Sequence, residues 1–307
     1  MAQLQPALDA RSWAMLVFLS VLWGGSFLFI GVAVKELSPL VIVFARVTIA
    51  AAALLPFHYA RLGALPSDRR SWIAFAGMSL LNNVIPFTLI ATGQTMIASG
   101  LAAVINATAP MFGAMVLAAS GEERLIARKA VALLIGLSGV AVLKGAGFAQ
   151  SGGQSLGILL CIGGAASYGL STLWVKRRMK GMPSLTMATG QLLCSSLIMA
   201  VLAFSFDRPM QLLQASALSW LALLALALLA TSLAYLVFFA IIARAGAANV
   251  LLVTMLIPVS AILFGSLLLG EDLSIREIAG AVVIGAALIL FDGRALHWFS
   301  RPRQHPG

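Results

Sequence analysis

The sequence predicts an all-α protein that crosses a membrane many times. Three observations carry this prediction: only 10% of the 307 residues are charged, 61% are hydrophobic, and the mean hydropathy is +1.02. Soluble domains are about a quarter charged, so this composition leaves too little polar surface to cover the apolar side chains in water. It therefore excludes a water-soluble enzyme, a disordered chain and a nucleic-acid-binding domain. We interpret the net charge of +10 as basic loop residues at a membrane surface.

Uninterrupted apolar runs predict the helices in order. A helix needs about 20 apolar residues to cross the hydrocarbon core of a bilayer. Ten runs near this length lie at residues 13–34, 40–57, 72–90, 97–119, 130–148, 156–175, 185–206, 218–243, 250–269 and 275–291. Short polar connections with Gly, Pro and Ser separate them. Cys161 and Cys194 both lie inside apolar runs, so we expect no disulfide framework.

The distribution of basic residues predicts the orientation of these helices. Cytoplasmic loops of membrane proteins carry an excess of Lys and Arg. Of the 20 Lys and Arg residues, 15 fall in the termini and one set of loops, four fall in the other set, and Arg46 lies inside a span. We therefore expect both termini to be cytoplasmic.

The two halves of the chain repeat one another at an offset of 145 to 149 residues. Each half holds five spans, and an odd number makes the second copy enter the membrane from the opposite face. Inverted-topology repeats are a transporter architecture, with the substrate site near the membrane midplane. We expect one five-helix repeat at 13–148, a second at 155–292, and a basic cytoplasmic tail at 293–307. The matched positions are Ser71-Trp72 with Ser219-Trp220, Trp23-Gly24 with Tyr168-Gly169, Pro110 with Pro258, and Gly121-Glu122 with Gly270-Glu271.

Short motifs mark these repeats: a Trp-Gly-Gly-Ser run at 23–26, Arg46 in the second span, an Ala-Ala approach to Pro110 and Pro258, and a Gly-Glu corner before the last helix of each half. The set resembles the EamA family of the drug/metabolite transporter superfamily, over essentially the whole chain. The resemblance implies ten helices in inverted halves and export of metabolites, often amino acids, and the chain is most similar to the aromatic amino acid exporter branch. One departure is Gln191, which stands in the second half where the first has Arg46. A substrate ligand at this position would come from one half only.

Polar and aromatic side chains inside the spans are candidates for a substrate path. Polar groups are costly in a bilayer interior and tend to face protein or water. Hydrogen bonding between helices explains many of the polar residues equally well, and core packing explains the rings, so both interpretations stay open. The candidates are Trp23, Ser26, Arg46, Asn82, Asn83, Gln94, Asn106, Tyr168, Ser171, Trp174, Gln191, Tyr235 and Thr254. Pro86, Pro110 and Pro258 remove helical hydrogen bonds at depth and are candidate hinges.

Arg46 is the only ionisable residue well inside an expected span. It lies roughly 10 Å from the outer end at 1.5 Å per residue. A buried arginine must meet carbonyl groups, water or an anion. One interpretation is a helix-capping or gating hydrogen-bond hub, and the other is recognition of a substrate carboxylate.

Signatures of other chemistries are absent from the sequence. The interior of the expected spans holds no Asp, Glu or His, since Glu277 stands at the start of the tenth span and His58 at the end of the second, so a proton relay has no titrating group there. The chain has no P-loop for ATP, no metal-ligand cluster and no nucleophile with a base. We therefore expect no enzyme, no cofactor, no metal, no nucleic-acid partner and no ATPase subunit.

These features favour secondary transport of a small solute across a lipid bilayer. We expect an exporter of amino acids, aromatic and neutral ones first, and of related neutral or zwitterionic metabolites. It would work by alternating access in the cell inner (plasma) membrane, as facilitative transport or exchange. Two alternatives stay open: a non-transport membrane scaffold or lipid-handling protein, which would move no solute in liposomes, and a channel, which would conduct through a continuous pore.

Overall fold

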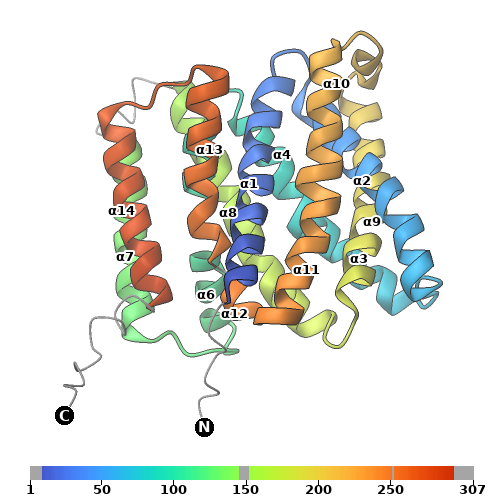
Figure 1. Ribbon diagram of the computed structural model, residues 1–307, viewed down its shortest axis with the longest axis horizontal. Helices are drawn as coiled ribbons and strands as arrows, with labels where there is room; N and C mark the ends of the chain where they lie inside the picture. The colour runs from blue at the N-terminus through green and yellow to red at the C-terminus, as the bar shows by residue number, and fades with distance from the viewer. Residues whose placement is uncertain (1–8, 145–151, 251, 294–307) are drawn as a thin grey trace.

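Helices account for the secondary structure that we describe. The computed structural model describes residues 9–144, 152–250 and 252–293, and within these ranges it holds helices and no strands (Figure 1). The first half contains α1 (Ala10–Ala33), α2 (Pro39–Leu62), α3 (Arg69–Ser79), the π-helix η1 (Leu80–Val84), α4 (Ile85–Gly93), α5 (Ser99–Asn106), α6 (Ala109–Ala119) and α7 (Ala127–Lys144). The second half contains α8 (Gly152–Arg178), α9 (Ser184–Phe206), the 3₁₀-helix η2 (Pro209–Leu213), α10 (Ala217–Leu224), the π-helix η3 (Ala225–Leu233), α11 (Ala234–Ala245), α12 (Ala247–Val250), α13 (Val253–Leu269) and α14 (Ile275–Asp292). Residues 145–148 of the first predicted repeat, and the predicted basic tail after Gly293, lie outside the described residues.

Seven helical runs are long and apolar enough to cross a membrane. They are Ala10–Ala33, Pro39–Leu62, Arg69–Gly93, Ser99–Ala119, Gly153–Arg178, Ser184–Phe206 and Ala217–Ala245, and Val253–Leu269 is a shorter apolar helix. The fifth and tenth predicted spans form α7 and α14, which have 18 residues and three charged residues each. The prediction of an all-helical, multi-pass membrane protein is thus confirmed.

Three of the predicted spans are interrupted rather than continuous. The third and the eighth each pass through a π-helix, η1 and η3, near their middle. The fourth is broken between Asn106 and Ala109, and Pro110 stands in the first turn of α6 after the break. Proline has no backbone N–H to continue the helical ladder and is well suited to the first turn of a helix, where that N–H has no partner.

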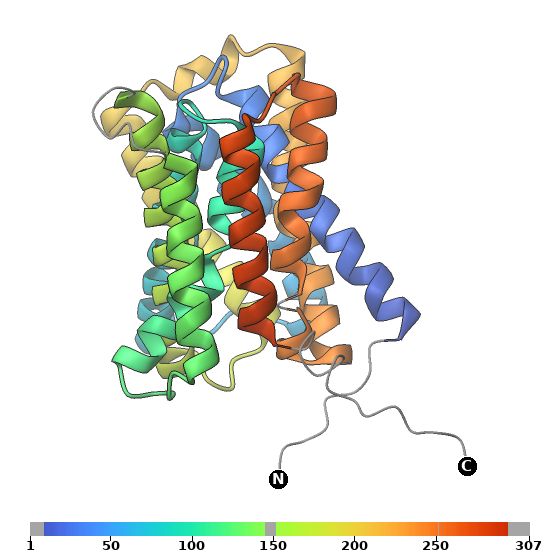
Figure 2. The same ribbon diagram turned by 90° about the vertical axis from the view of Figure 1, so that its left-hand side faces the viewer.

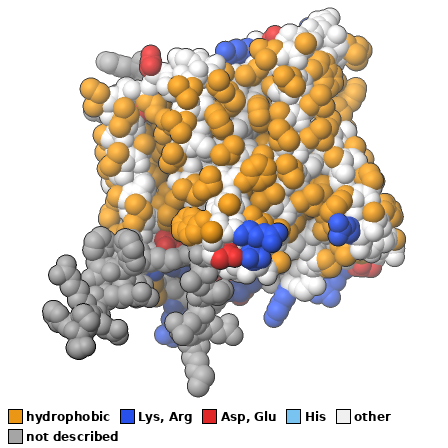
Figure 3. Space-filling view, in the orientation of Figure 1, with side chains coloured by type: hydrophobic (Ala, Val, Ile, Leu, Met, Phe, Trp, Pro, Cys, Tyr) orange, Lys and Arg blue, Asp and Glu red, His pale blue; other side chains and the backbone are white. Residues whose placement is uncertain are grey.

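The helices run up and down between two ends of the bundle. The start of α1 and the end of α14 lie at the same end (Figures 1 and 2), which we call the terminal end. The opposite, distal end carries the connections 34–38, 207–216 and 270–274. Figure 3 shows apolar side chains over the flank between the two ends, with most of the visible Lys and Arg at the terminal end. Such a flank suits contact with lipid.

Corresponding helices of the two halves lie side by side. α2 packs on α9, α7 on α14, and α5 on α13. The first helix of each half also packs on the fourth span of the other half: α1 on α13, and α8 on α5 and α6. At the α1–α13 contact, Gly24 faces Ser260 so closely that a Cβ atom has no room. Gly169, 145 residues after Gly24, meets Phe112 of α6 in the same way. The α7–α14 pair lies at one edge of the bundle (Figure 1), which leaves the other helices around the centre.

Candidate functional site

Two π-helical turns lie at equivalent places in the two halves. The residues 148 positions after η1 are 228–232, which lie inside η3. In η1 the amide of Ile85 donates to the carbonyl five residues earlier, and Pro86 follows without an N–H. In η3 the hydroxyls of Thr231 and Ser232 donate to carbonyls five residues earlier. Since π-turns inside α-helices are frequent at functional sites, they direct attention to the side chains around them.

Arg46 of α2 lies against both π-turn regions. Its Nε donates to Oγ1 of Thr231 in η3 at 2.9 Å. Its guanidinium carbon lies 3.6 Å from the ring centroid of Phe87, one turn after η1. The residue is only 6% exposed. Among the described residues, its two terminal nitrogens donate to no group and no carboxylate pairs with it.

A second set of hydrogen bonds connects amide and hydroxyl groups of η1, α9 and α11. Nδ2 of Asn82 lies 3.3 Å from Oε1 of Gln191 and 3.4 Å from the hydroxyl oxygen of Tyr235. That hydroxyl donates to Oδ1 of Asn83 at 3.2 Å, and Nδ2 of Asn83 donates to Ser195 at 2.9 Å. We call Arg46, Asn82, Asn83, Gln191, Ser195, Thr231 and Tyr235 the polar centre. It joins η1 of the first half to α9 and α11 of the second.

The contacts of the polar centre fit the repeat that the sequence predicts. Arg46 and Gln191 are equivalent at an offset of 145, and Gln191 is likewise buried, at 4% exposed. Arg46 contacts Thr231 in the π-helix of the second half, and Gln191 contacts Asn82 in the π-helix of the first. Each half thus supplies one buried side chain to the other half's π-turn, and only one of the two is charged.

Aromatic rings border the polar centre. The phenols of Tyr168 and Tyr235 lie within electrostatic range of the Arg46 guanidinium. Both tyrosines are half-buried, and Tyr168 packs between the two large apolar clusters of the bundle. Phe87 is thus in direct contact with the cation, and the two phenols interact with its charge.

The other predicted path residues lie in several places. Trp23 is half-buried with its ring 5.4 Å from Phe238, Ser26 is buried in α1, and Thr254 is half-buried in α13. Ser171 donates to the carbonyl of Tyr168 in its own helix at 2.7 Å.

Three predicted residues act as links or lie at a helix break. Nε2 of Gln94 donates to the carbonyl of Phe27 at 2.9 Å and ties the end of α4 to α1. Nε1 of Trp174 donates to the carbonyl of Ala74 at 2.9 Å, which joins α8 to α3. Asn106 ends α5, and its buried Oδ1 has no hydrogen-bond partner among the described residues.

The three candidate hinges differ in local structure. Pro86 directly follows η1, and Pro110 follows the break between α5 and α6. Pro258 instead lies inside the uninterrupted helix α13. Equivalent positions in the repeat therefore have different backbone geometry.

His58 is buried against a neighbouring helix. The predicted second span ends at residue 57, whereas α2 continues to Leu62. His58 is therefore buried at 1% exposed, with Nε2 3.0 Å from Oγ1 of Thr186 in α9. His58 thus stands near the end of α2, where the continuation of the helix packs it against α9.

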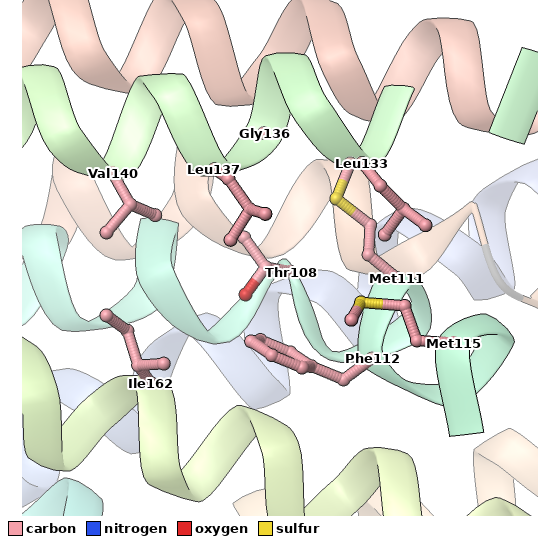
Figure 4. Close-up of a pocket in the computed structure, with 9 residues that line it drawn as sticks. All are labelled: Thr108, Met111, Phe112, Met115, Leu133, Gly136, Leu137, Val140 and Ile162. Atoms are coloured by element: carbon pink, nitrogen blue, oxygen red, sulfur yellow. The ribbon is translucent and has the colours of Figure 1, made fainter. Parts of the chain in front are cut away.

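An apolar pocket lies beside the break between α5 and α6, against α7 and α8 (Figure 4). Thr108, Met111, Leu133 and Ile162 are among its lining residues. The Thr108 hydroxyl donates to the carbonyl of Ile105 at 2.6 Å, so it is already engaged within its own turn. The pocket encloses about 30 Å³, room for one or two water molecules. It is too small and too apolar to be the site of a polar solute.

The distal end is held by a carboxylate at a helix N-terminus. Glu271 of the α13–α14 corner accepts from the Ser99 amide at 3.0 Å, from the Ser99 hydroxyl at 2.6 Å and from the Gly100 amide at 3.4 Å. Ser99 is the first residue of α5 and is 1% exposed. This contact joins the second half to the first.

The equivalent corner at the terminal end is built differently. Glu122, 149 residues before Glu271, pairs with Arg177 at 2.8 Å and with Lys176 at 3.6 Å. Its side chain is 27% exposed, and the cations are more exposed still. The hydrogen bond from Arg177 lowers the pKa of Glu122 from its ordinary value.

The candidate list omitted Phe87, Thr231 and Ser195. The repeat could have identified Thr231, because it stands 148 residues after Asn83, which was a candidate. In the structure Thr231 contacts Arg46. Phe87 and Ser195 carry no comparable signal, since a ring or a hydroxyl in an apolar span is ordinarily a packing residue.

Comparison with known proteins decides the family. A family model described as "EamA-like transporter family" matches residues 11–144 and 155–291. The chain belongs to the EamA-like transporter family. It is similar to the uncharacterized transporter YvbV of Bacillus subtilis, 27% identical over 93% of this chain and 92% of that one. It is also similar to the uncharacterized transporter YoaV of the same organism, 24% identical over 90% and 94% of the two chains.

A further relative and a solved structure extend the comparison. An uncharacterized transporter of Archaeoglobus fulgidus is 24% identical over 91% of this chain and 99% of its own. A crystal structure with no descriptive name superposes with a TM-score of 0.66 at 18% identity, covering 95% of this chain and all of that one. The latter likeness shows the fold alone.

Proposed function

We propose that this EamA-family protein is a secondary transporter that exports amino acids, aromatic and neutral ones first, and related small metabolites by alternating access. The observation that carries the proposal is the polar centre, in which a buried arginine and buried amides from both halves meet at two π-turns. Polar groups inside a membrane are costly and mark solute pathways. The transporters among its relatives support the same class of function.

We infer ten spans in two inverted five-helix repeats, at 13–148 and 155–292. α7 and α14 measure about 27 Å at 1.5 Å per residue, close to the thickness of a hydrocarbon core. Their charged residues stand in the first three positions or the last. The exchange of equivalent contacts between the halves supports the repeat, and the excess of Lys and Arg supports cytoplasmic termini in an inner (plasma) membrane.

The side chains at the polar centre support the choice of substrate. Phe87 stacks on the guanidinium, and the phenols of Tyr168 and Tyr235 interact with its charge. Aromatic rings at a site give a ring-bearing solute apolar partners. The amides of Asn82 and Gln191 offer both donors and acceptors to a zwitterion. This combination suits a small molecule that carries a ring and opposite charges.

The driving force is proposed to be the solute's own gradient, as facilitative transport or exchange. No residue of the polar centre titrates near neutral pH. In proteoliposomes the equilibrium ratio of solute across the membrane should approach one at any imposed pH gradient. Accumulation that follows the proton gradient and collapses with an uncoupler would contradict this proposal.

A counterflow screen tests the function. Proteoliposomes are loaded with one unlabelled amino acid at a time and offered the same amino acid in labelled form, with protein-free liposomes as the control. We expect transient uptake above the control for a subset of the amino acids, aromatic ones included. A protein that moves none of the twenty would favour the scaffold interpretation.

A further inference from the structure

We propose that Arg46 is the binding site for a carboxylate of the transported solute, and that its two terminal nitrogens hold that group. The inference rests on the proposed function in one respect, that the bound molecule is the solute that the protein transports. It rests on the geometry of Arg46 for the chemistry of the site.

The first step is the state of the guanidinium. Arg46 is 94% buried, and only its Nε donates to a described residue, Thr231. An arginine keeps its charge at any cellular pH. A buried charge without a partner is strongly unfavourable, so the two terminal nitrogens require an acceptor.

The second step is that none of the Asp and Glu side chains of the protein pairs with Arg46. All ten Asp and Glu residues of the sequence lie in the described ranges, in connections or within the first or last three residues of a helix. The described ion pairs use Asp9, Glu122 and Glu123. Glu271 is bound to Ser99, and Glu277 to Ser274 and Gln154. An anion that pairs with Arg46 would therefore come from outside the side chains of the protein.

The third step is the fit of a carboxylate. Phe87 covers one face of the guanidinium at 3.6 Å, and Thr231 fixes Nε, so the plane of the group is set by two contacts. The free edge presents two parallel N–H donors, the geometry that a carboxylate accepts in a bidentate way. The phenols of Tyr168 and Tyr235 lie nearby. A ring-bearing carboxylate would meet the cation and the aromatic surface together.

The fourth step is the asymmetry of the repeat. The equivalent of Arg46 in the second half is the neutral Gln191. The site therefore has a single charge on one side of the centre, which gives a zwitterionic solute one orientation: its carboxylate toward α2 and its ammonium group away from it.

The experiment uses purified full-length protein in detergent and four small probes. L-phenylalanine has a carboxylate and an ammonium group, 3-phenylpropionate only the first, phenethylamine only the second, and L-phenylalaninamide replaces the carboxylate of phenylalanine by a neutral amide. Binding is measured by ligand-induced thermal stabilisation. We expect the two carboxylates to bind at least about tenfold more tightly than the amide and the amine.

Two variants sharpen the test. Arg46→Gln should abolish the preference for the acid over the amide. Arg61→Gln removes an exposed arginine from the same helix and should keep the wild-type preference. Equal affinity for acid and amide in the wild type, no binding of either carboxylate, or an unchanged preference in Arg46→Gln would each overturn the inference. The wild-type comparison needs no variant, so a poorly folding Arg46→Gln protein leaves the test intact.

The outcomes separate this inference from the proposed function. Phenylalanine counterflow without a binding preference for the carboxylate would refute the Arg46 site and support the proposed transport. Carboxylate binding by Arg46 with no counterflow of any amino acid would support the site and refute the proposed amino acid transport.

Discussion

The two ends of the bundle use equivalent glutamates for different contacts. At the distal end Glu271 accepts hydrogen bonds from the first turn of α5, and it forms no ion pair within the part of the chain that the structure describes. At the terminal end Glu122 forms exposed ion pairs with Arg177 and Lys176. The positions equivalent to these two cations, 145 residues earlier, are Gly31 and Val32. Without a cation there, Glu271 turns to the positive end of a helix instead.

This difference indicates that the distal end is the more firmly held of the two in the structure described here. Hydrogen bonds from buried donors to a carboxylate are strong, whereas exposed ion pairs contribute little and are screened by salt. In the proposed transport cycle, opening the distal end means separating Glu271 from α5. Closing and opening the terminal end involves contacts that are weaker and more sensitive to the solvent.

The largest expected effect is from Glu271→Gln. An amide can accept one of these hydrogen bonds but turns its NH₂ group toward donors, so we expect a loss of about 2 kcal/mol of stability. Thermal unfolding in detergent would report it as a lower Tm. Glu122→Gln, the equivalent change at the terminal end, should lower Tm less. A larger effect from Glu122→Gln would reverse the comparison between the two ends.

A glycine under Glu271 gives the second prediction. A Cβ atom on Gly265 would collide with the Glu271 carboxylate and approach the Ser99 hydroxyl, so Gly265→Ala should displace Glu271 and cost about 1 kcal/mol. Gly285 of α14 has open space around an added Cβ. Gly285→Ala is the matched control and should leave Tm unchanged or raise it slightly. Equal behaviour of the two variants would show that Glu271 tolerates displacement.

The smallest expected effect concerns pH at the terminal end. The hydrogen bond from Arg177 lowers the pKa of Glu122 below its ordinary value of 4.5. Its contribution to stability is therefore complete above pH 4.5 and is lost as the pH falls through the lower value of the folded protein. The Tm difference between wild type and Glu122→Gln should shrink over that acidic range, and 0.5 M NaCl should reduce it at neutral pH. A difference that grows toward acidic pH would contradict the assignment.

The sequence predicted the positions of the helices well, because long apolar runs have one stable solution in a bilayer. It could not predict the two π-turns, since these depend on Pro86 in one half and on the hydroxyls of Thr231 and Ser232 in the other. Hydropathy treats both segments as ordinary helix. Hydropathy also ends the second span at residue 57, whereas α2 continues to Leu62 and buries His58.

For the candidate site, residue type was more informative than position. Arg46 and the amides stood out because charged and amide groups are rare in spans, and the structure joins Arg46, Asn82, Asn83, Gln191 and Tyr235. Gln94 and Trp174 satisfied the same rule yet bond to backbone carbonyls of neighbouring helices. Sequence alone cannot separate these cases, because both roles require a polar group that is buried between helices.

The most direct test of alternating access is a reversible cross-link at the distal end. A Cβ atom on Gly100 of α5 would lie 3.6 Å from the Cβ of Ile262 in α13, within the range of a disulfide. The pair Gly100→Cys and Ile262→Cys, in a chain with Cys161 and Cys194 replaced by Ala, would join the two halves beside Glu271. We expect oxidation to stop amino acid counterflow and reduction to restore it. Counterflow by the fully cross-linked protein at the rate of the reduced protein would contradict alternating access through this end.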